Sequence, residues 1–115
     1  MSEKADLAYL RHLLDSLEAV EEFSKNLKKE ELFSNRLKQS AIIREMEVIG
    51  EAVKNLSSAL KRKHSKTDWK RIAGTRDKLI HHYFGVDLNI IWDIIKQDLP
   101  PLKEEVKKIL EEVSS

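Results

Sequence analysis

The chain contains no cysteine, which excludes disulfides, thiol catalysis and thiolate metal ligands. Glycine and proline are scarce, with three and two residues in 115, and this shortage of turn-forming residues favours long helices. No apolar run approaches the roughly 20 residues of a membrane span, and the charged start MSEKADLAYL lacks the apolar core of a signal peptide. We therefore expect a soluble, cytoplasmic protein.

The composition is rich in charge but still sufficient for a hydrophobic core. Charged residues make up 36% of the chain and apolar residues 41%, which argues against disorder. The length predicts one domain over residues 1–115. Since the net charge is only +1, any attraction to nucleic acid must come from local clustering of basic side chains.

Apolar periodicity predicts an all-α, up-and-down bundle of about four to five helices, with no alternating strand pattern. The expected helices span about Ala5–Leu27, Asn35–Lys61, Trp69 to Tyr83 or Phe84, Leu88–Gln97 and Pro101–Val113.

Caps and helix breakers define most of these boundaries. Ser34, either Thr67 or Asp68, and Asp87 are expected N-caps, because their side chains can accept hydrogen bonds from free amides of the first turn. Gly85 suits a left-handed helix end. The segment DLPP, residues 98–101, is expected to break the chain between the last two helices.

The second helix carries two apolar faces. The main one comprises Ile42, Met46, Ile49, Val53, Leu56 and Leu60, and a second face of smaller residues comprises Ala41, Val48, Ala52 and Ala59 beside Gly50. One face can pack in the bundle while the other, where small residues permit close approach, meets another helix or a second subunit. Alternatively, both faces pack within one monomer.

The window RDKLIHHYFGVD, residues 76–87, places an arginine in an apolar stripe. Ile72, Arg76, Leu79, Ile80 and Tyr83 share one helix face. Because arginine is almost never buried without a partner, Arg76 should either hold an anion in a cleft or pair with a carboxylate such as Glu51 or Asp87.

Two adjacent histidines follow on other faces of this helix. His81 lies roughly 140° around the helix from Arg76, so one straight helix does not aim both side chains at one point. Asp77 precedes His81 by one turn and can accept a hydrogen bond from its imidazole. His81 and His82 are a poor metal pair, since adjacent helical residues face apart. A lone helical histidine is most often structural or exposed.

The available chemistry favours RNA. The chain has no glycine-rich phosphate loop, no HExxH and no zinc-ligand spacing, which leaves arginine, histidine and tyrosine beside a basic segment. This set suits metal-independent phosphodiester cleavage, with histidine moving protons and arginine stabilising charge on phosphorus. The basic residues expected to contact RNA phosphates, if they are not simply a solvated loop, are Lys61, Arg62, Lys63, Lys66, Lys70 and Arg71.

The motif Arg76-x4-His81-x-Tyr83 resembles the signature of HEPN ribonuclease toxins. The likeness extends to REMEVIGEAVKNLS, residues 44–57, and to WKRIAGTRDKLIHHYFGVDLNIIWDIIKQDLPPLKEEV, residues 69–106. These segments resemble the HepT-like branch, toxins that are partnered by minimal nucleotidyltransferase antitoxins.

The resemblance implies a homodimeric all-α bundle in which two motifs share one cleft. It implies a metal-independent endoribonuclease without a cofactor, acting on tRNA or mRNA, with Arg76 and His81 as catalytic residues. It also implies that the antitoxin adenylylates Tyr83 and thereby repels RNA.

The chain departs from the family pattern at two positions. Asp77 stands where Asn is common, and His82 stands where an acidic residue is common. Glu51 matches a recurrent glutamate and is interpreted as a structural partner of Arg76. The alternative functions are a non-catalytic nucleotide-binding bundle, in which Arg76 holds a phosphate, and a purely structural dimer.

Overall fold

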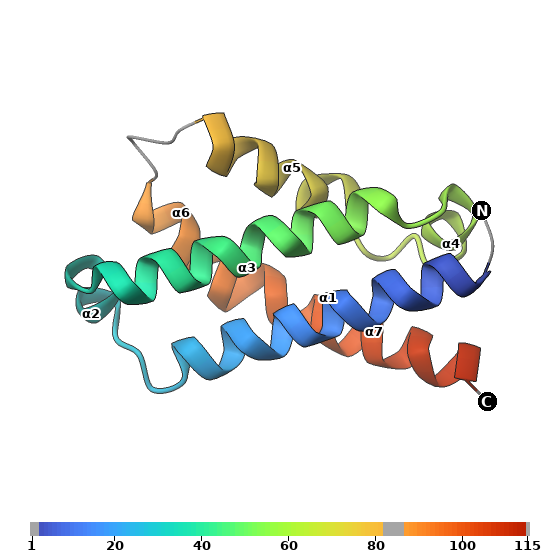
Figure 1. Cartoon of the computed structure of the whole chain (residues 1–115), viewed down its shortest axis with the longest axis horizontal. Helices are drawn as coiled ribbons and strands as arrows, with labels where there is room; N and C mark the ends of the chain where they lie inside the picture. Colours follow the sequence, from blue (N-terminus) through green and yellow to red (C-terminus); the bar gives the residue numbers. More distant parts are fainter. Residues whose placement is uncertain (1–2, 82–86, 115) are drawn as a thin grey trace.

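The computed structural model describes residues 3–81 and 87–114, and every element in these ranges is helical (Figure 1). The elements are α1 (Glu3–Ser24), α2 (Lys29–Ser34), α3 (Arg36–Asn55), α4 (Ser58–Lys63), α5 (Trp69–His81), α6 (Leu88–Asp93), the π-helical turn η1 (Ile94–Asp98) and α7 (Leu99–Ser114). The predicted all-α bundle is confirmed, and the short helices α2 and α4 are additions to it. None of these described helices combines the length and hydropathy needed to cross a membrane.

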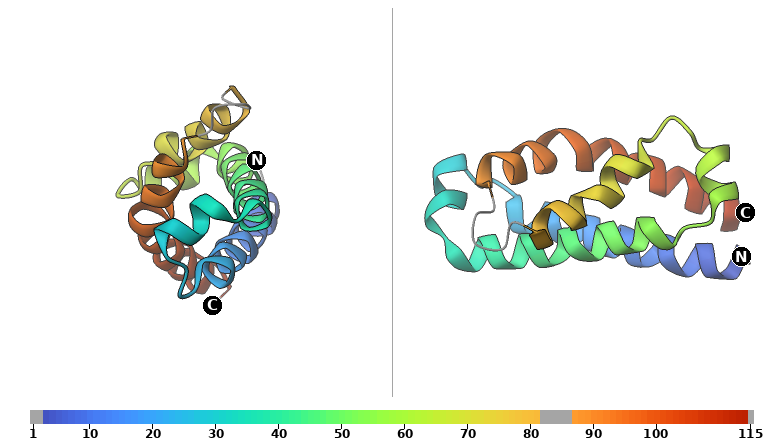
Figure 2. Two further views of the ribbon diagram at one scale, coloured as in Figure 1. Left: turned by 90° about the vertical axis from the view of Figure 1, so that its left-hand side faces the viewer. Right: turned by 90° about the horizontal axis from the view of Figure 1, so that it is seen from above.

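The long helices run side by side in an elongated bundle of 43 × 28 × 21 Å (Figure 2). Helix α3 packs against α1 on one side and against α5 on the other, and α1 also packs against α7. On the second predicted face, Ala52 and the adjacent Gly50 are buried within the chain, Ala41 and Val48 are half-buried, and Ala59 is exposed on α4 (Ser58–Lys63). A dimer stays a prediction.

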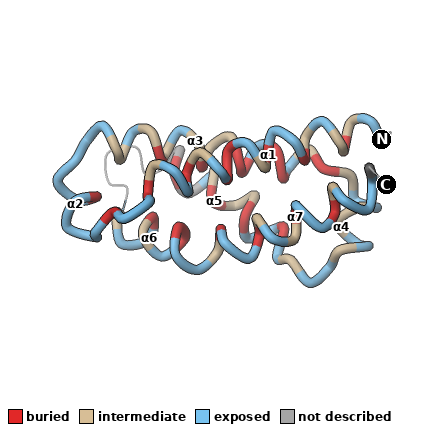
Figure 3. The backbone as a smooth tube through the Cα atoms, turned by 90° about the horizontal axis from the view of Figure 1, so that it is seen from below, coloured by how far each residue is buried: buried red, intermediate tan, exposed pale blue. Residues whose placement is uncertain are grey.

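Buried residues of α1, α3, α5 and the C-terminal helices form one core cluster, and Figure 3 colours the buried positions red along the backbone. Its most completely buried residues include Leu10, Leu13, Ile42, Met46, Val53, Leu102, Val106 and Ile109. Most of them belong to the predicted stripes, because residues at three- and four-residue spacing share one face of a helix. Across the surface, Lys103 Nζ donates to Glu21 Oε2 at 2.8 Å and joins α7 to α1. This hydrogen bond raises the pKa of Lys103.

Two of the predicted N-caps are confirmed and one is wrong. Asp68 Oδ1 accepts from the Arg71 amide at 3.0 Å, and Asp87 Oδ1 accepts from the Asn89 amide at 2.9 Å. Helix α3, however, is capped by Asn35, whose Oδ1 accepts from the Lys38 amide at 3.0 Å. Ser34 instead ends α2, a short helix that was not predicted.

The first two long helices end earlier than predicted. Helix α1 ends at Ser24 because Asn26 adopts a left-handed φ of 59°, which asparagine tolerates. Helix α3 ends at Asn55, since Leu56 is extended and Ser57 caps α4. Asp6 fixes Ser57 through two hydrogen bonds. Its Oδ1 accepts from the Ser57 amide at 2.8 Å, and its Oδ2 accepts from the Ser57 hydroxyl at 2.6 Å.

The DLPP segment does not break the chain, contrary to the prediction. Residues 88–114 stay helical through η1, in which the Leu99 amide donates to the Ile94 carbonyl. This wider turn has i→i−5 bonding, so Pro100 and Pro101 enter the first turn of α7 without ending the helix.

Candidate active site

The site is built where α5 crosses α3 at Gly50. A Cβ atom placed on Gly50 would lie 2.7 Å from Arg76 Cβ and 3.3 Å from the Arg76 amide nitrogen. The two helix backbones approach closely here because Gly50 has no side chain. Gly50 is therefore the point at which α5 approaches α3, whereas the small residues Ala41, Val48 and Ala52 lie roughly 160–180° around the helix from it.

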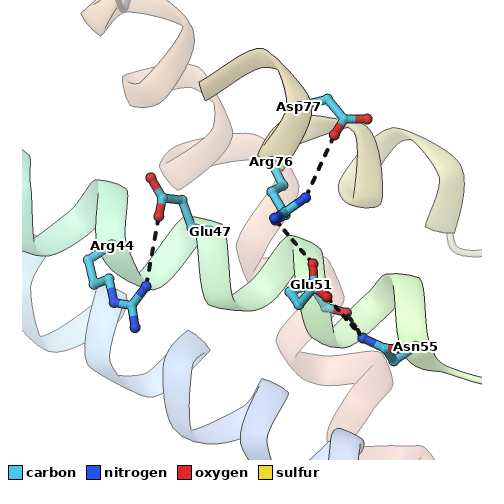
Figure 4. A network of polar contacts seen from close by, with 6 residues as sticks. All are labelled: Arg44, Glu47, Glu51, Asn55, Arg76 and Asp77. Carbon is cyan, nitrogen blue, oxygen red and sulfur yellow. Dashed lines mark hydrogen bonds and ion pairs between the residues drawn. The ribbon is translucent and has the colours of Figure 1, made fainter. Parts of the chain in front are cut away.

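Arg76 leaves this crossing with its guanidinium beside Glu51 (Figure 4). Its Nε lies 3.0 Å from Glu51 Oε2, and its Nη1 lies 4.0 Å from Asp77 Oδ1. The Arg76 side chain remains 33% exposed. Of the two carboxylates considered as partners, the structure therefore places Glu51 on Arg76, while Asp87 caps α6.

Glu51 is itself held by the next turn of α3. Asn55 Nδ2 donates to the Glu51 carbonyl at 2.9 Å and to Glu51 Oε1 at 3.4 Å. Neither Nη group of Arg76 donates a hydrogen bond to another described residue. Its Nη1 lies within ion-pair distance of Asp77 but too far away for a hydrogen bond. An arginine fixed through Nε in this way keeps its outer edge available for a phosphate oxygen.

Of the remaining motif residues, the structure describes only the backbone of one. His81 is the last residue of α5, and its side chain lies outside the described residues. His82, Tyr83 and Gly85 lie entirely outside them. The meeting of Arg76, His81 and Tyr83 stays a prediction, as does the hydrogen bond from His81 to the exposed Asp77.

The six predicted RNA-binding cations separate into three places. Lys61, Arg62, Lys66 and Lys70 line an open hollow of about 770 Å³ between the end of α3, α4 and the start of α5. Lys63 lies in a different pocket beside His64 and Glu112. Arg71 Nη2 pairs with Asp98 Oδ1 at 3.3 Å. We call the first of these places the basic hollow.

The basic hollow contains one cation that sequence reasoning missed. Lys54 lines it from α3, one turn after Glu51. Ala73 lines it from α5, one turn before Arg76. The three-residue spacing of Lys54 from Glu51 places both residues on neighbouring parts of one helix face. Only the packing of α5 on α3 shows that this face borders the basic hollow. The hollow therefore lies one helical turn from the Arg76–Glu51 pair.

His64 is a second residue that sequence reasoning missed. Its Nδ1 lies 3.4 Å from Glu105 Oε1 and its Nε2 lies 3.7 Å from Glu112 Oε2, so it connects the end of α4 to α7. Its carbonyl accepts the indole N–H of the buried Trp69 at 3.0 Å. The sequence could not predict these ion pairs, because both glutamates lie more than 40 residues after His64. Among the described residues, no group of three or more histidine, aspartate or glutamate side chains is placed to bind a metal ion.

Comparisons with known proteins agree with the motif. Residues 13–109 match the family model described as "Ribonuclease HepT-like". The chain is 45% identical over 108 residues to "Putative RNase TTE0752" of Caldanaerobacter subterraneus subsp. tengcongensis, covering 94% of this chain and 96% of that protein. It is 41% identical over 101 residues to "Probable ribonuclease HepT" of Thermococcus cleftensis, covering 88% and 92%.

A further relative is longer than this chain. The chain is 46% identical over 105 residues to "Gamma-glutamylcyclotransferase and putative RNase MJ0434" of Methanocaldococcus jannaschii, a match that covers 91% of this chain and 47% of that protein. The chain thus spans about half of that relative's length. No solved structure gives a significant match. The matched residues include the crossing of α3 and α5, the Arg76–Glu51 pair and the basic hollow, and the chain belongs to the HepT-like ribonuclease family.

Proposed function

We propose that this chain is the toxin of a toxin–antitoxin pair and acts as a metal-independent endoribonuclease with Arg76 and His81 as its catalytic residues. The observation that carries the proposal is the state of Arg76. Its guanidinium is fixed by Glu51 at 3.0 Å, one-third exposed and one turn from a basic hollow. A cation held in this way is preorganised for a phosphate.

The chemistry follows from the two side chains. The 2′-oxygen of the substrate attacks the adjacent phosphorus after giving up its proton, and the 5′-oxygen of the next nucleotide leaves with a proton. His81 can accept the first proton or supply the second, and Arg76 stabilises the charge on the phosphorane oxygens. The products are a 2′,3′-cyclic phosphate and a 5′-hydroxyl end.

In this proposal a second subunit allows Arg76 and His81 to reach the same phosphate. Arg76 and His81 lie roughly 140° apart on an α-helix, so a homodimer that brings two copies of α5 to one cleft lets them meet at one phosphate. The cognate minimal nucleotidyltransferase antitoxin would attach AMP to Tyr83. The added bulk and negative charge then repel RNA from the cleft.

Cleavage in the absence of divalent metal tests the activity. We expect the purified protein to cut total RNA or tRNA in the presence of EDTA, and to leave 5′-hydroxyl ends that polynucleotide kinase labels without prior phosphatase treatment. Loss of cleavage in EDTA, with recovery on adding Mg²⁺, would contradict the metal-independent mechanism.

Adenylylation of Tyr83 is tested with the partner enzyme. We expect incubation with the cognate nucleotidyltransferase and ATP to add AMP to the chain, seen by mass spectrometry, and to suppress cleavage. Tyr83→Phe should retain cleavage but escape both effects, because it lacks the acceptor hydroxyl. Equal modification of wild type and Tyr83→Phe would place the acceptor elsewhere.

A further inference from the structure

We infer that the basic hollow is a separate RNA subsite, which binds the phosphates of a single-stranded segment flanking the cleaved bond and does not read its bases. This inference deepens the proposed function and rests on it. It also adds Lys54 to the binding residues and removes Lys63 and Arg71 from the set that the sequence predicted.

The first argument is the concentration of charge. The chain as a whole has a net charge of +1. The hollow is lined by five cations, Lys54, Lys61, Arg62, Lys66 and Lys70, against a single carboxylate, Asp68. Asp68 is already used as the cap of α5, and none of the five cations has an ion pair within the part of the chain that the structure describes. Such a surface attracts a polyanion and releases its counterions.

The second argument is the position of the hollow. Lys54 and Ala73 lie on its wall, one turn from Glu51 and Arg76 respectively. A strand whose scissile phosphate contacts Arg76 can therefore continue along the crossing of α3 and α5 into the hollow. In-line attack by a 2′-hydroxyl also needs a backbone geometry that regular duplex RNA does not adopt, so a single strand is the expected occupant.

The third argument concerns what the hollow lacks. Base stacking in single-strand binders uses exposed aromatic side chains or arginine planes, and amide groups are among the side chains that read base edges. Trp69 lines the hollow but is only 6% exposed, and its indole N–H is donated to the His64 carbonyl. The lining residues include no other aromatic side chain and no Asn or Gln. Four of the five cations are lysines, flexible point charges suited to phosphates, and phosphate contacts position RNA without specifying its sequence.

The test is equilibrium binding of fluorescent single-stranded RNA to the full chain carrying His81→Ala, so that no cleavage is needed. We expect the double variant Lys54→Gln/Lys66→Gln to bind more weakly. The slope of log K against log salt should fall by about 0.7 for each lost phosphate contact, about 1.4 for the pair. The matched control is Lys107→Gln/Lys108→Gln, two exposed lysines of α7 outside the hollow, which should leave the slope unchanged.

Three results would overturn the inference. The first is a wild-type slope and affinity in the Lys54→Gln/Lys66→Gln variant. The second is competition by polyglutamate as effective as that by RNA of equal charge, which would make the hollow a docking site for acidic protein. The third is a preference of more than tenfold among U, A and C homopolymers that disappears in the double variant. Any of them leaves the EDTA cleavage assay standing, so failure of the subsite is distinguishable from failure of the nuclease.

Discussion

Arg76→Ala and His81→Ala are each expected to lower the rate of RNA cleavage by about 10²–10⁴-fold, the usual contribution of acid–base catalysis or of a preorganised charge. Arg76→Lys should recover little of the loss. Lysine keeps the positive charge but lacks both the Nε that meets Glu51 at 3.0 Å and the fork that binds two phosphate oxygens. The measurement is single-turnover cleavage of a labelled RNA under saturating protein.

A structural role for Arg76 is separated from a catalytic one by Glu51→Gln. This variant weakens the same contact but leaves the guanidinium in place. The Arg76 and Glu51 side chains are 33% and 50% exposed, so loss of the pair should change the free energy of unfolding by no more than about 1 kcal/mol in either variant. If Arg76 only stabilises the fold, Arg76→Ala and Glu51→Gln will have similar melting temperatures and both will cleave RNA normally. Normal cleavage by folded Arg76→Ala would remove the catalytic assignment.

Local sequence signals predicted the features that depend on neighbours along the chain. The stripe Ile42, Met46, Ile49 and Val53 is buried, and Asp68 and Asp87 cap the helices that follow them. The expectation that Arg76 takes an anionic partner followed from a general cost, because a guanidinium in an apolar stripe requires an anion. Glu51 and Asp87 both remained open as that partner, and the structure places Glu51 on Arg76. The HepT-like family assignment followed from the motif and is confirmed by the family match.

Features that depend on distant residues were mispredicted or missed. The early end of α3 is stabilised by Asp6, which lies 51 residues before Ser57, so the apolar pattern alone continued the helix to Lys61. The DLPP segment stayed helical because a π-helical turn accommodates its prolines, and no sequence pattern marks that turn. Lys54 joined the basic hollow only through the packing of α3 on α5.

Gly50→Ala is expected to destabilise the protein and to lower cleavage, although alanine is the better helix former. The new methyl group would lie 2.7 Å from Arg76 Cβ, so the backbone of α5 must move away from α3. Overpacking of this kind costs typically about 1–3 kcal/mol, which exceeds the gain of about 1 kcal/mol in helix propensity. Because Arg76 moves with the backbone, a shift of about 1 Å can lower the rate by about 10²-fold.

Gly74→Ala is the matched control, since it makes the same chemical change on the partner helix. A Cβ at Gly74 meets no atom within 4 Å, and Gly74 lies inside the continuous helix α5. We expect this variant to raise the free energy of unfolding by about 0.5–1 kcal/mol and to cleave RNA normally. Urea denaturation and single-turnover cleavage of both variants decide the question. If Gly50→Ala and Gly74→Ala stabilise the protein equally, α3 and α5 do not touch closely at Gly50, and the crossing does not hold Arg76 in place.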